Sequence, residues 1–211
     1  MPVGNDIVDF RAEADLLPRR HPRFADRILS PEEQNWRSRQ PDTERALWIL
    51  WAAKESSYKL LKQTDAGLIY SPVRFQADPD QGRVVHDGTV VDVRVDTDEE
   101  RVFCQATLPS AGAVPIGETG RIAALLVKEA PGPDESGLPD QSKAVRRLLR
   151  RMLARVKGWD PAHISVGRGT GKVPVLLHQG SACAISLSLT HHGRFCGVSI
   201  LDPAGASPAP D

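Results

Sequence analysis

A stretch with neither glycine nor proline runs from residue 44 to residue 62 and constrains the fold more than any other feature of the chain. Side chains, most of them apolar, recur through it at the spacing of one helix face. The positions on this stripe are Leu47, Leu50, Trp51, Lys54, Tyr58 and Leu61. The pattern predicts one long helix whose apolar face must be covered by other elements.

Short segments in which apolar and polar residues alternate predict strands, because successive side chains of a strand point to opposite faces of a sheet. In the first part of the chain these segments are 3–8, 73–77, 83–85, 90–95, 101–108 and the apolar run 120–128. In the last part they are 163–167, 173–177, 184–189 and 195–201. Turn residues such as Asp87-Gly88 separate several of them and favour antiparallel pairing.

Two further helix signals complete the expected elements of an α+β fold. Ser30, Pro31 and Glu33 predict a helix start with a capping box. Residues 142–157 predict a basic amphipathic helix, and we expect its charged side to be a solvated face. A nucleic-acid-binding module centred on residues 146–157 is the competing interpretation, disfavoured because no aromatic stacking platform lies nearby.

The segment 130–141 is rich in proline, glycine and acids and predicts a linker. We therefore expect a first lobe over residues 1–128, a linker over 129–141 and a second lobe over 142–202. The tail 203–211, with three prolines, is expected to be disordered.

The composition is that of a globular protein with no global electrostatic preference. Lys plus Arg and Asp plus Glu both number 27, so no net field draws the chain to nucleic acid or to an anionic membrane. The three cysteines are widely spaced without a metal-ligand pattern and are expected to be structural. Without a basic leader or a long apolar run, the protein is expected to be soluble and cytoplasmic.

Three segments combine residue types suited to metal and phosphate chemistry. The run Gly4-Asn5-Asp6 brings a carboxylate to the rim of a short strand. Glu55 and Lys59 lie one turn apart on one face of the long helix, where alone they would be an ordinary surface ion pair. The third segment, Thr190-His191-His192, ends an apolar strand near the C-terminus.

Together these motifs resemble those of the 4'-phosphopantetheinyl transferase superfamily. Residues 3–8 resemble its acidic strand, residues 51–59 its Trp-x-x-Lys-Glu-x-x-x-Lys helix, and residues 189–191 its Ser/Thr-His motif. The segment 171–174 resembles its Gly-Lys-Pro turn with one residue inserted. Residues 23–33 are close to its first helical region.

The resemblance implies an enzyme that transfers the 4'-phosphopantetheine group of coenzyme A to a serine of an apo acyl or peptidyl carrier protein, releasing 3',5'-ADP. Asp6 and Glu55 would hold Mg²⁺, with Mn²⁺ as an alternative, and Glu55 and Lys59 would be catalytic. Coenzyme A would contact Lys59, Lys172, Thr190 and His191. The carrier would contact Arg19, Arg20, Arg23 and Arg27.

Larger members of this family carry a second acid two residues after the first, and here that position is Val8. Water or Asp9 would then complete the metal site, although Asp9 should point to the opposite face of the strand. His192 also departs from the family, which more often has a small or acidic residue there.

The resemblance further implies two similar lobes in permuted order, each a small antiparallel sheet packed with a long helix, forming a pseudo-dimer. Such a chain is expected to be an active monomer with one site at the seam between lobes. A non-catalytic relative that binds coenzyme A or a carrier is the alternative function. The carrier class, whether for fatty-acid, polyketide or nonribosomal peptide biosynthesis, and the tolerance for acyl-coenzyme A stay open.

Overall fold

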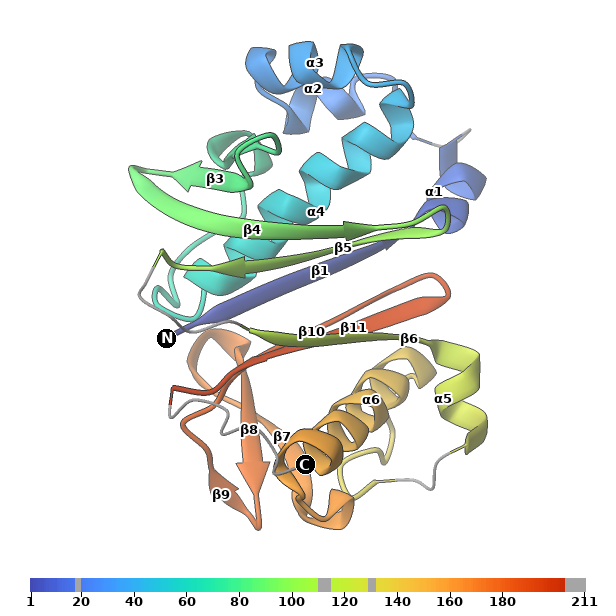
Figure 1. The fold of residues 1–211 in the computed structure, drawn as a ribbon, viewed down its shortest axis with the longest axis vertical. Helices are drawn as coiled ribbons and strands as arrows, with labels where there is room; N and C mark the ends of the chain where they lie inside the picture. The colour runs from blue at the N-terminus through green and yellow to red at the C-terminus, as the bar shows by residue number, and fades with distance from the viewer. Residues whose placement is uncertain (18–19, 110–114, 129–131, 204–211) are drawn as a thin grey trace, which may run out of the picture.

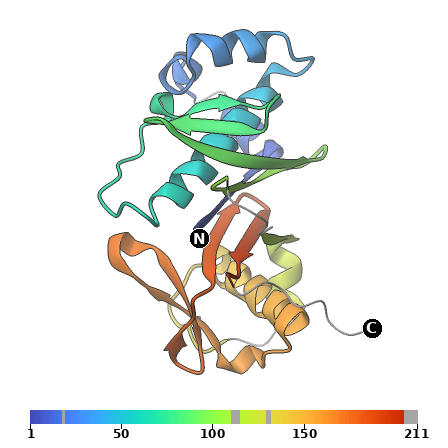
Figure 2. The ribbon, with the colours of Figure 1, turned by 60° about the vertical axis from the view of Figure 1, so that its left-hand side comes forward.

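The computed structural model describes residues 1–17, 20–109, 115–128 and 132–203, and they form an α+β fold of two lobes. Lobe 1 spans residues 3–107 and lobe 2 spans residues 116–201. Figures 1 and 2 show lobe 1, coloured blue to green, stacked on lobe 2, coloured green-yellow to red. The expected α+β class with two lobes is confirmed.

Lobe 1 is a five-stranded antiparallel sheet with a long helix packed against it. Its strands are β1 (Val3–Asp9), β2 (Gln76–Asp78), β3 (Arg83–His86), β4 (Thr89–Thr97) and β5 (Arg101–Thr107), in the order β1-β5-β4-β3-β2. Its helices are α1 (Phe10–Leu16), α2 (Phe24–Ile28), α3 (Pro31–Ser38), α4 (Thr43–Leu61) and the short η2 (Pro72–Arg74). Helix α4 is the predicted long helix.

Lobe 2 has a three-stranded sheet of β6 (Ile116–Arg121), β10 (Ser186–His192) and β11 (Phe195–Leu201), in the order β10-β11-β6. A second small sheet joins β7 (Ile164–Arg168), β8 (Pro174–His178) and β9 (Ser181–Ala182). The helices are α5 (Ile122–Lys128), α6 (Asp140–Lys157), η3 (Pro161–His163) and η4 (Thr170–Lys172). Helix α6 supplies much of the core of this lobe.

The two lobes share one topology. Each begins with a strand, continues into a long helix, and ends with a hairpin whose last strand lies between the first strand and its own hairpin partner. Thus β1, α4, β4 and β5 correspond to β6, α6, β10 and β11.

The chain between the lobes differs from expectation. Residues 122–128 form a helix because Ile122, Leu125 and Leu126 follow i, i+3, i+4 spacing, so the strand predicted over 120–128 is correct only up to Arg121. Strand β6 pairs with β11, which places the division between lobes before residue 116 rather than at residue 128. Residues 129–131 of the expected linker and 204–211 of the expected disordered tail lie outside the described residues.

The basic side of α6 is not uniformly solvated, which corrects the expectation for two of its arginines. Arg147 and Arg150 are buried and form ion pairs with Glu135, and Arg150 also pairs with Asp134. Asp134 and Glu135 therefore hold the proline-rich segment against α6. Arg151 and Arg155 follow the expected pattern more closely, exposed and paired with Glu118.

A buried ion pair and two further hydrogen bonds connect α4 to α2, α3 and η2. The Lys54 ammonium group is fully buried and donates to the Glu33 carboxylate at 2.6 Å, the Ile28 carbonyl at 2.6 Å and the Pro72 carbonyl at 3.1 Å. Glu33 also completes the predicted capping box with Ser30. This carboxylate therefore links the start of α3 to the middle of α4.

The seam between lobes is formed where the outer edge of β1 meets β10. Three backbone N–H groups of β1 donate to β10 side chains at 3.0 Å each: Val3 to Ser186 Oγ, Asn5 to Ser188 Oγ, and Asp9 to His192 Nδ1. The other edge of β1 pairs with β5, and one face of β1 lies directly on α4, because a Cβ at Gly4 would stand 1.9 Å from the Ser56 carbonyl oxygen. Only glycine allows this approach, which brings Asp6 close to Glu55 and Lys59.

Two sequence features remain, the three cysteines and the hydrophobicity of the helices. The cysteines are free, with Cys104 and Cys196 buried and Cys183 half-buried. Across the described ranges, every helix is too short or too polar to cross a bilayer.

Candidate active site

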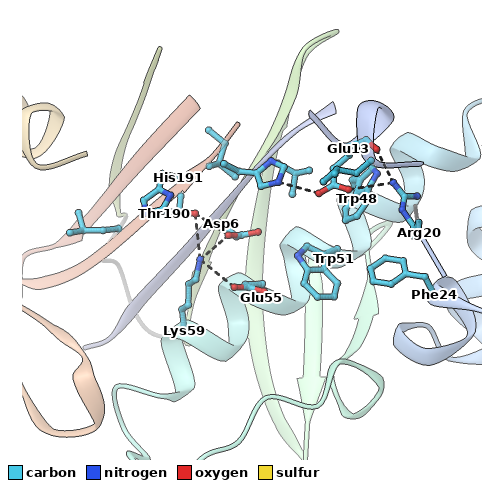
Figure 3. A pocket seen from close by; sticks show the side chains of 15 residues that line it. Asp6, Glu13, Arg20, Phe24, Trp48, Trp51, Glu55, Lys59, Thr190 and His191 are labelled. Atoms are coloured by element: carbon cyan, nitrogen blue, oxygen red, sulfur yellow. Dashed lines mark hydrogen bonds and ion pairs between the residues drawn. The ribbon is translucent and has the colours of Figure 1, made fainter. Parts of the chain in front are cut away.

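A pocket of about 610 Å³ opens at the seam and is lined by β1, α1, α4 and β10, together with residues near α2. Figure 3 shows its side chains converging from both lobes. One half is polar, with Asp6, Glu55, Lys59, Thr190 and His191. The other half is largely apolar, with Leu16, Phe24, Trp48 and Trp51. We call it the seam pocket.

The Lys59 ammonium group joins two carboxylates in the polar half. It lies 2.7 Å from Asp6 Oδ1 and 3.6 Å from Glu55 Oε1. Burial alone would lower the pKa of Lys59, but the charges of Asp6 and Glu55 outweigh it and raise that pKa. Lys59 is therefore charged at neutral pH and available to an anionic ligand.

For Glu55, in contrast to Lys59, the pocket disfavours the charged form of the side chain. Burial, followed by the nearby Asp6 carboxylate, raises the pKa of Glu55, while Lys59 partly offsets both effects. Two carboxylates that repel each other in one pocket would be stabilised by a divalent cation or by a shared proton. A carboxylate with a raised pKa is also better suited to accept a proton.

Lobe 2 completes the polar half through two residues of the Thr-His segment. The buried Thr190 hydroxyl donates to Asp6 Oδ1 at 3.0 Å, and Lys59 Nζ lies 3.4 Å from the same hydroxyl. His191 is exposed to the pocket, and burial together with the Lys59 charge lowers its pKa. The imidazole of His191 is therefore neutral at pH 7.

Lys172 lines a second, adjoining pocket of about 220 Å³ rather than the seam pocket. This second pocket also contains Lys62 and Gln63, and it shares Lys59 and Leu189 with the seam pocket. The two hollows therefore follow one another along the seam, with Lys59 at their junction.

The four arginines named from the sequence lie in different surroundings. Arg23 and Arg27 are exposed, and Arg19 falls outside the described residues. Arg20 is only 12% exposed: it pairs with Glu13 and Glu44, and its guanidinium lies 4.7 Å from the centre of the Trp48 ring. Arg20 is thus part of the pocket wall.

Asp9 is not among the residues that line the seam pocket. Its buried carboxylate accepts hydrogen bonds from Arg194 and from the backbone of Arg11 and Ala12. Burial would raise the pKa of Asp9, but the Arg194 bonds lower it to about 2. This side chain has no capacity left for a metal in the pocket.

Several pocket residues were not identified from the sequence. Phe24, Trp48 and Trp51 form a packed aromatic wall with ring centres 5.8 to 6.4 Å apart. His192 Nε2 lies 3.1 Å from Glu13 Oε1 across the seam. The Asp9 N-cap followed by Glu13 was the available signal for α1, which was not predicted.

A metal ion would have to rely on few protein ligands. No cluster of three or more His, Cys, Asp or Glu side chains suited to a metal occurs in the part of the chain that the structure describes. Asp6 and Glu55 alone fit a Mg²⁺ ion, which commonly takes one or two carboxylates and completes its octahedron with water and substrate phosphate oxygens. The two carboxylates share one pocket with a single ammonium group, Lys59, so their charges leave room for a further cation beside them.

Comparison with known proteins gives a family match. Residues 2–103 match the family model described as 4'-phosphopantetheinyl transferase superfamily. Among solved structures, the chain is similar to holo-[acyl-carrier-protein] synthase of Thermotoga maritima, with 17% identity and a TM-score of 0.36 over 62% of this chain and 75% of that one. A search of curated proteins gave no match.

Proposed function

We propose that this chain, whose residues 2–103 match the 4'-phosphopantetheinyl transferase superfamily, transfers the 4'-phosphopantetheine group of coenzyme A to a serine of an apo carrier protein and releases 3',5'-ADP. One observation carries the proposal. Two carboxylates and an ammonium group from lobe 1 meet Thr190 and His191 from lobe 2 in one pocket.

The reaction needs charge stabilisation on a pyrophosphate and a base for a hydroxyl. Held by Asp6 and Glu55, Mg²⁺ or Mn²⁺ would neutralise pyrophosphate charge as a Lewis acid. The Lys59 ammonium compensates negative charge that develops on the departing 3',5'-ADP. Glu55 takes the proton from the serine hydroxyl directly or through a water molecule that it orients.

The order of the two pockets along the seam supports one orientation of coenzyme A. In this proposed orientation the nucleotide end would bind beside Lys172 and Lys62, and the pyrophosphate would bind at the junction near Lys59. His191 contacts a phosphate group from the lobe 2 side. The seam pocket beyond Lys59, toward α1, is left for the serine.

The carrier is expected to bind near the same opening. Carrier proteins of this kind are acidic around their serine, so a neutral enzyme needs a local basic surface. Arg23 and Arg27, both exposed, are the described candidates for direct contact. Arg20 supports this surface from within the pocket wall.

The decisive experiment is mass spectrometry of a panel of apo carriers incubated with the protein, coenzyme A and Mg²⁺. A mass gain of one phosphopantetheine arm supports the proposal and identifies the carrier class. Binding of coenzyme A or a carrier without any mass gain supports the non-catalytic alternative. Light scattering during the assay tests the further proposal that a soluble monomer is the active form.

Replacing His191 by Ala is expected to raise the Kd for coenzyme A about tenfold and to change kcat less, because a phosphate contact exists before and during reaction. The pKa of free His191 is lowered, and a bound phosphate favours its charged form, so binding takes up a proton. The affinity of the wild type should therefore increase as the pH falls toward 6.

Calorimetry at pH 6 and pH 8 measures this effect, with the exposed His163 as the matched control for substitution by Ala. A change in the protonation of coenzyme A itself between pH 6 and pH 8 alters the Kd of every variant by the same factor. An identical pH dependence in the wild type and in His191→Ala would exclude the phosphate contact.

A further inference from the structure

The hairpin of β10 and β11 contacts the start of α1 through the side chain of His192. His192 Nδ1 accepts the backbone N–H of Asp9 at 3.0 Å, so the ring proton of the neutral imidazole is on Nε2. This Nε2 lies 3.1 Å from Glu13 Oε1 and donates to it. One side chain of lobe 2 thus contacts both the N-cap and the first turn of α1.

Arg194, at the tip of the same hairpin, holds the Asp9 side chain. Its guanidinium donates to both Asp9 carboxylate oxygens, at 2.7 and 2.8 Å, and its backbone N–H adds a third bond of 2.8 Å. Gly193 has a φ of 52°, and a Cβ there would stand 2.4 Å from Asp9 Oδ2 and 2.8 Å from Ala12 Cβ. The hairpin tip therefore lies directly against the first turn of α1.

Helix α1 is short and only partly held by lobe 1. It has seven residues, and none of them is buried. A helix this short is not stable on its own in water. In lobe 1 its first residue, Phe10, packs against the core and donates its N–H to the Glu100 carbonyl, and Glu13 pairs with Arg20. The remaining polar contacts of its first turn come from the hairpin, so the position of α1 depends in part on lobe 2.

We propose that His192 and Arg194 form a clamp by which lobe 2 positions α1, and that α1, so held, forms the wall of the seam pocket that receives the carrier serine. The second part rests on the proposed function. Glu13 and Leu16 of α1 line the seam pocket but not the adjoining pocket that contains Lys172. The clamp residues are positioning residues, because they act through α1 and not on the reacting atoms.

Replacing His192 by Ala is therefore expected to separate carrier binding from coenzyme A binding. The KM for the carrier should rise about tenfold, while the Kd for coenzyme A changes less than twofold. His192→Gln should restore most of the loss, because its amide offers one acceptor and one donor in place of the two ring nitrogens. Steady-state kinetics and calorimetry measure the two constants.

The matched control is Ser186→Ala, at the opposite end of the same strand. It removes two seam hydrogen bonds, the one accepted from the Val3 N–H and the one donated to Gln63 Oε1, but it lies far along β10 from α1. Its KM for the carrier should equal that of the wild type. An equal rise in His192→Ala and Ser186→Ala would show a general effect of seam stability and would overturn the clamp.

Hydrogen exchange of the α1 amides tests the clamp without any transferase assay. Exchange over residues 10–16 should be faster in His192→Ala than in the wild type or in Ser186→Ala. Unchanged exchange in His192→Ala would overturn the clamp, whereas faster exchange with an unchanged carrier KM would overturn its role in carrier binding. If the wild type transfers nothing to any carrier, the proposed function fails and the exchange result still decides the clamp.

Discussion

Glu55→Gln is expected to lower kcat about 100-fold or more while leaving the fold as stable as before. The substitution removes a proton acceptor and weakens a metal ligand, and the loss of a general base alone is typically about 10²-fold or more. Because burial and the Asp6 charge disfavour the Glu55 carboxylate, a neutral amide should not lower the free energy of unfolding. Activity and stability therefore respond differently to the same change.

Steady-state kinetics at saturating Mg²⁺, together with thermal melts of the metal-free protein, measure the two effects. Lobe 2 provides the matched control, Glu118→Gln. Glu118 occupies β6, the counterpart of β1, and it pairs with Arg151 and Arg155 of α6, one turn apart. This variant should retain wild-type kcat, and full turnover by Glu55→Gln would contradict the assignment of Glu55.

Lys54→Met is expected to cost about 3–5 kcal/mol of the free energy of unfolding, although Lys54 directly precedes the proposed base. The substitution keeps the length of the side chain but leaves the buried Glu33 carboxylate without its 2.6 Å partner. It also leaves the Ile28 and Pro72 carbonyls without the ammonium donor. An uncompensated buried charge is the main cost.

Urea denaturation measures this loss, and a second substitution tests its cause. The double variant Lys54→Met with Glu33→Gln should lose less than Lys54→Met alone, because it removes the orphaned charge. A loss below about 1 kcal/mol for Lys54→Met would mean that the pair contributes little beyond packing.

The sequence predicted those elements whose signal is local and long. Helix α4 was evident from its side-chain periodicity, and the capping box of α3 from Ser30 and Glu33. Helix α1 was missed because a seven-residue helix without a buried face produces no periodic pattern. Residues 122–128 were taken for a strand because a short apolar run does not by itself distinguish the two structures.

The site was predictable only in part, for a related reason. The resemblance named Asp6, Glu55, Lys59, Thr190 and His191, and the structure brings these five residues to one pocket. It could not assign Lys54 to a buried pair or Arg20 to the pocket wall, because Glu33 lies 21 positions from Lys54 and Glu44 lies 24 positions from Arg20. The same holds for His192, whose partner Glu13 lies in the other lobe.

The seam has a consequence for how the protein matures during synthesis. The hydrogen bonds from Val3, Asn5 and Asp9 each reach a residue 183 positions further along the chain. Lobe 1 has all its strands by residue 107 and can begin to fold while the rest is still being translated. Thr190 and His191 emerge from the ribosome well after β5, and closing so long a loop is slow. Asp6 and Glu55 therefore belong to a lobe that can fold before the residues that complete the seam pocket have been made.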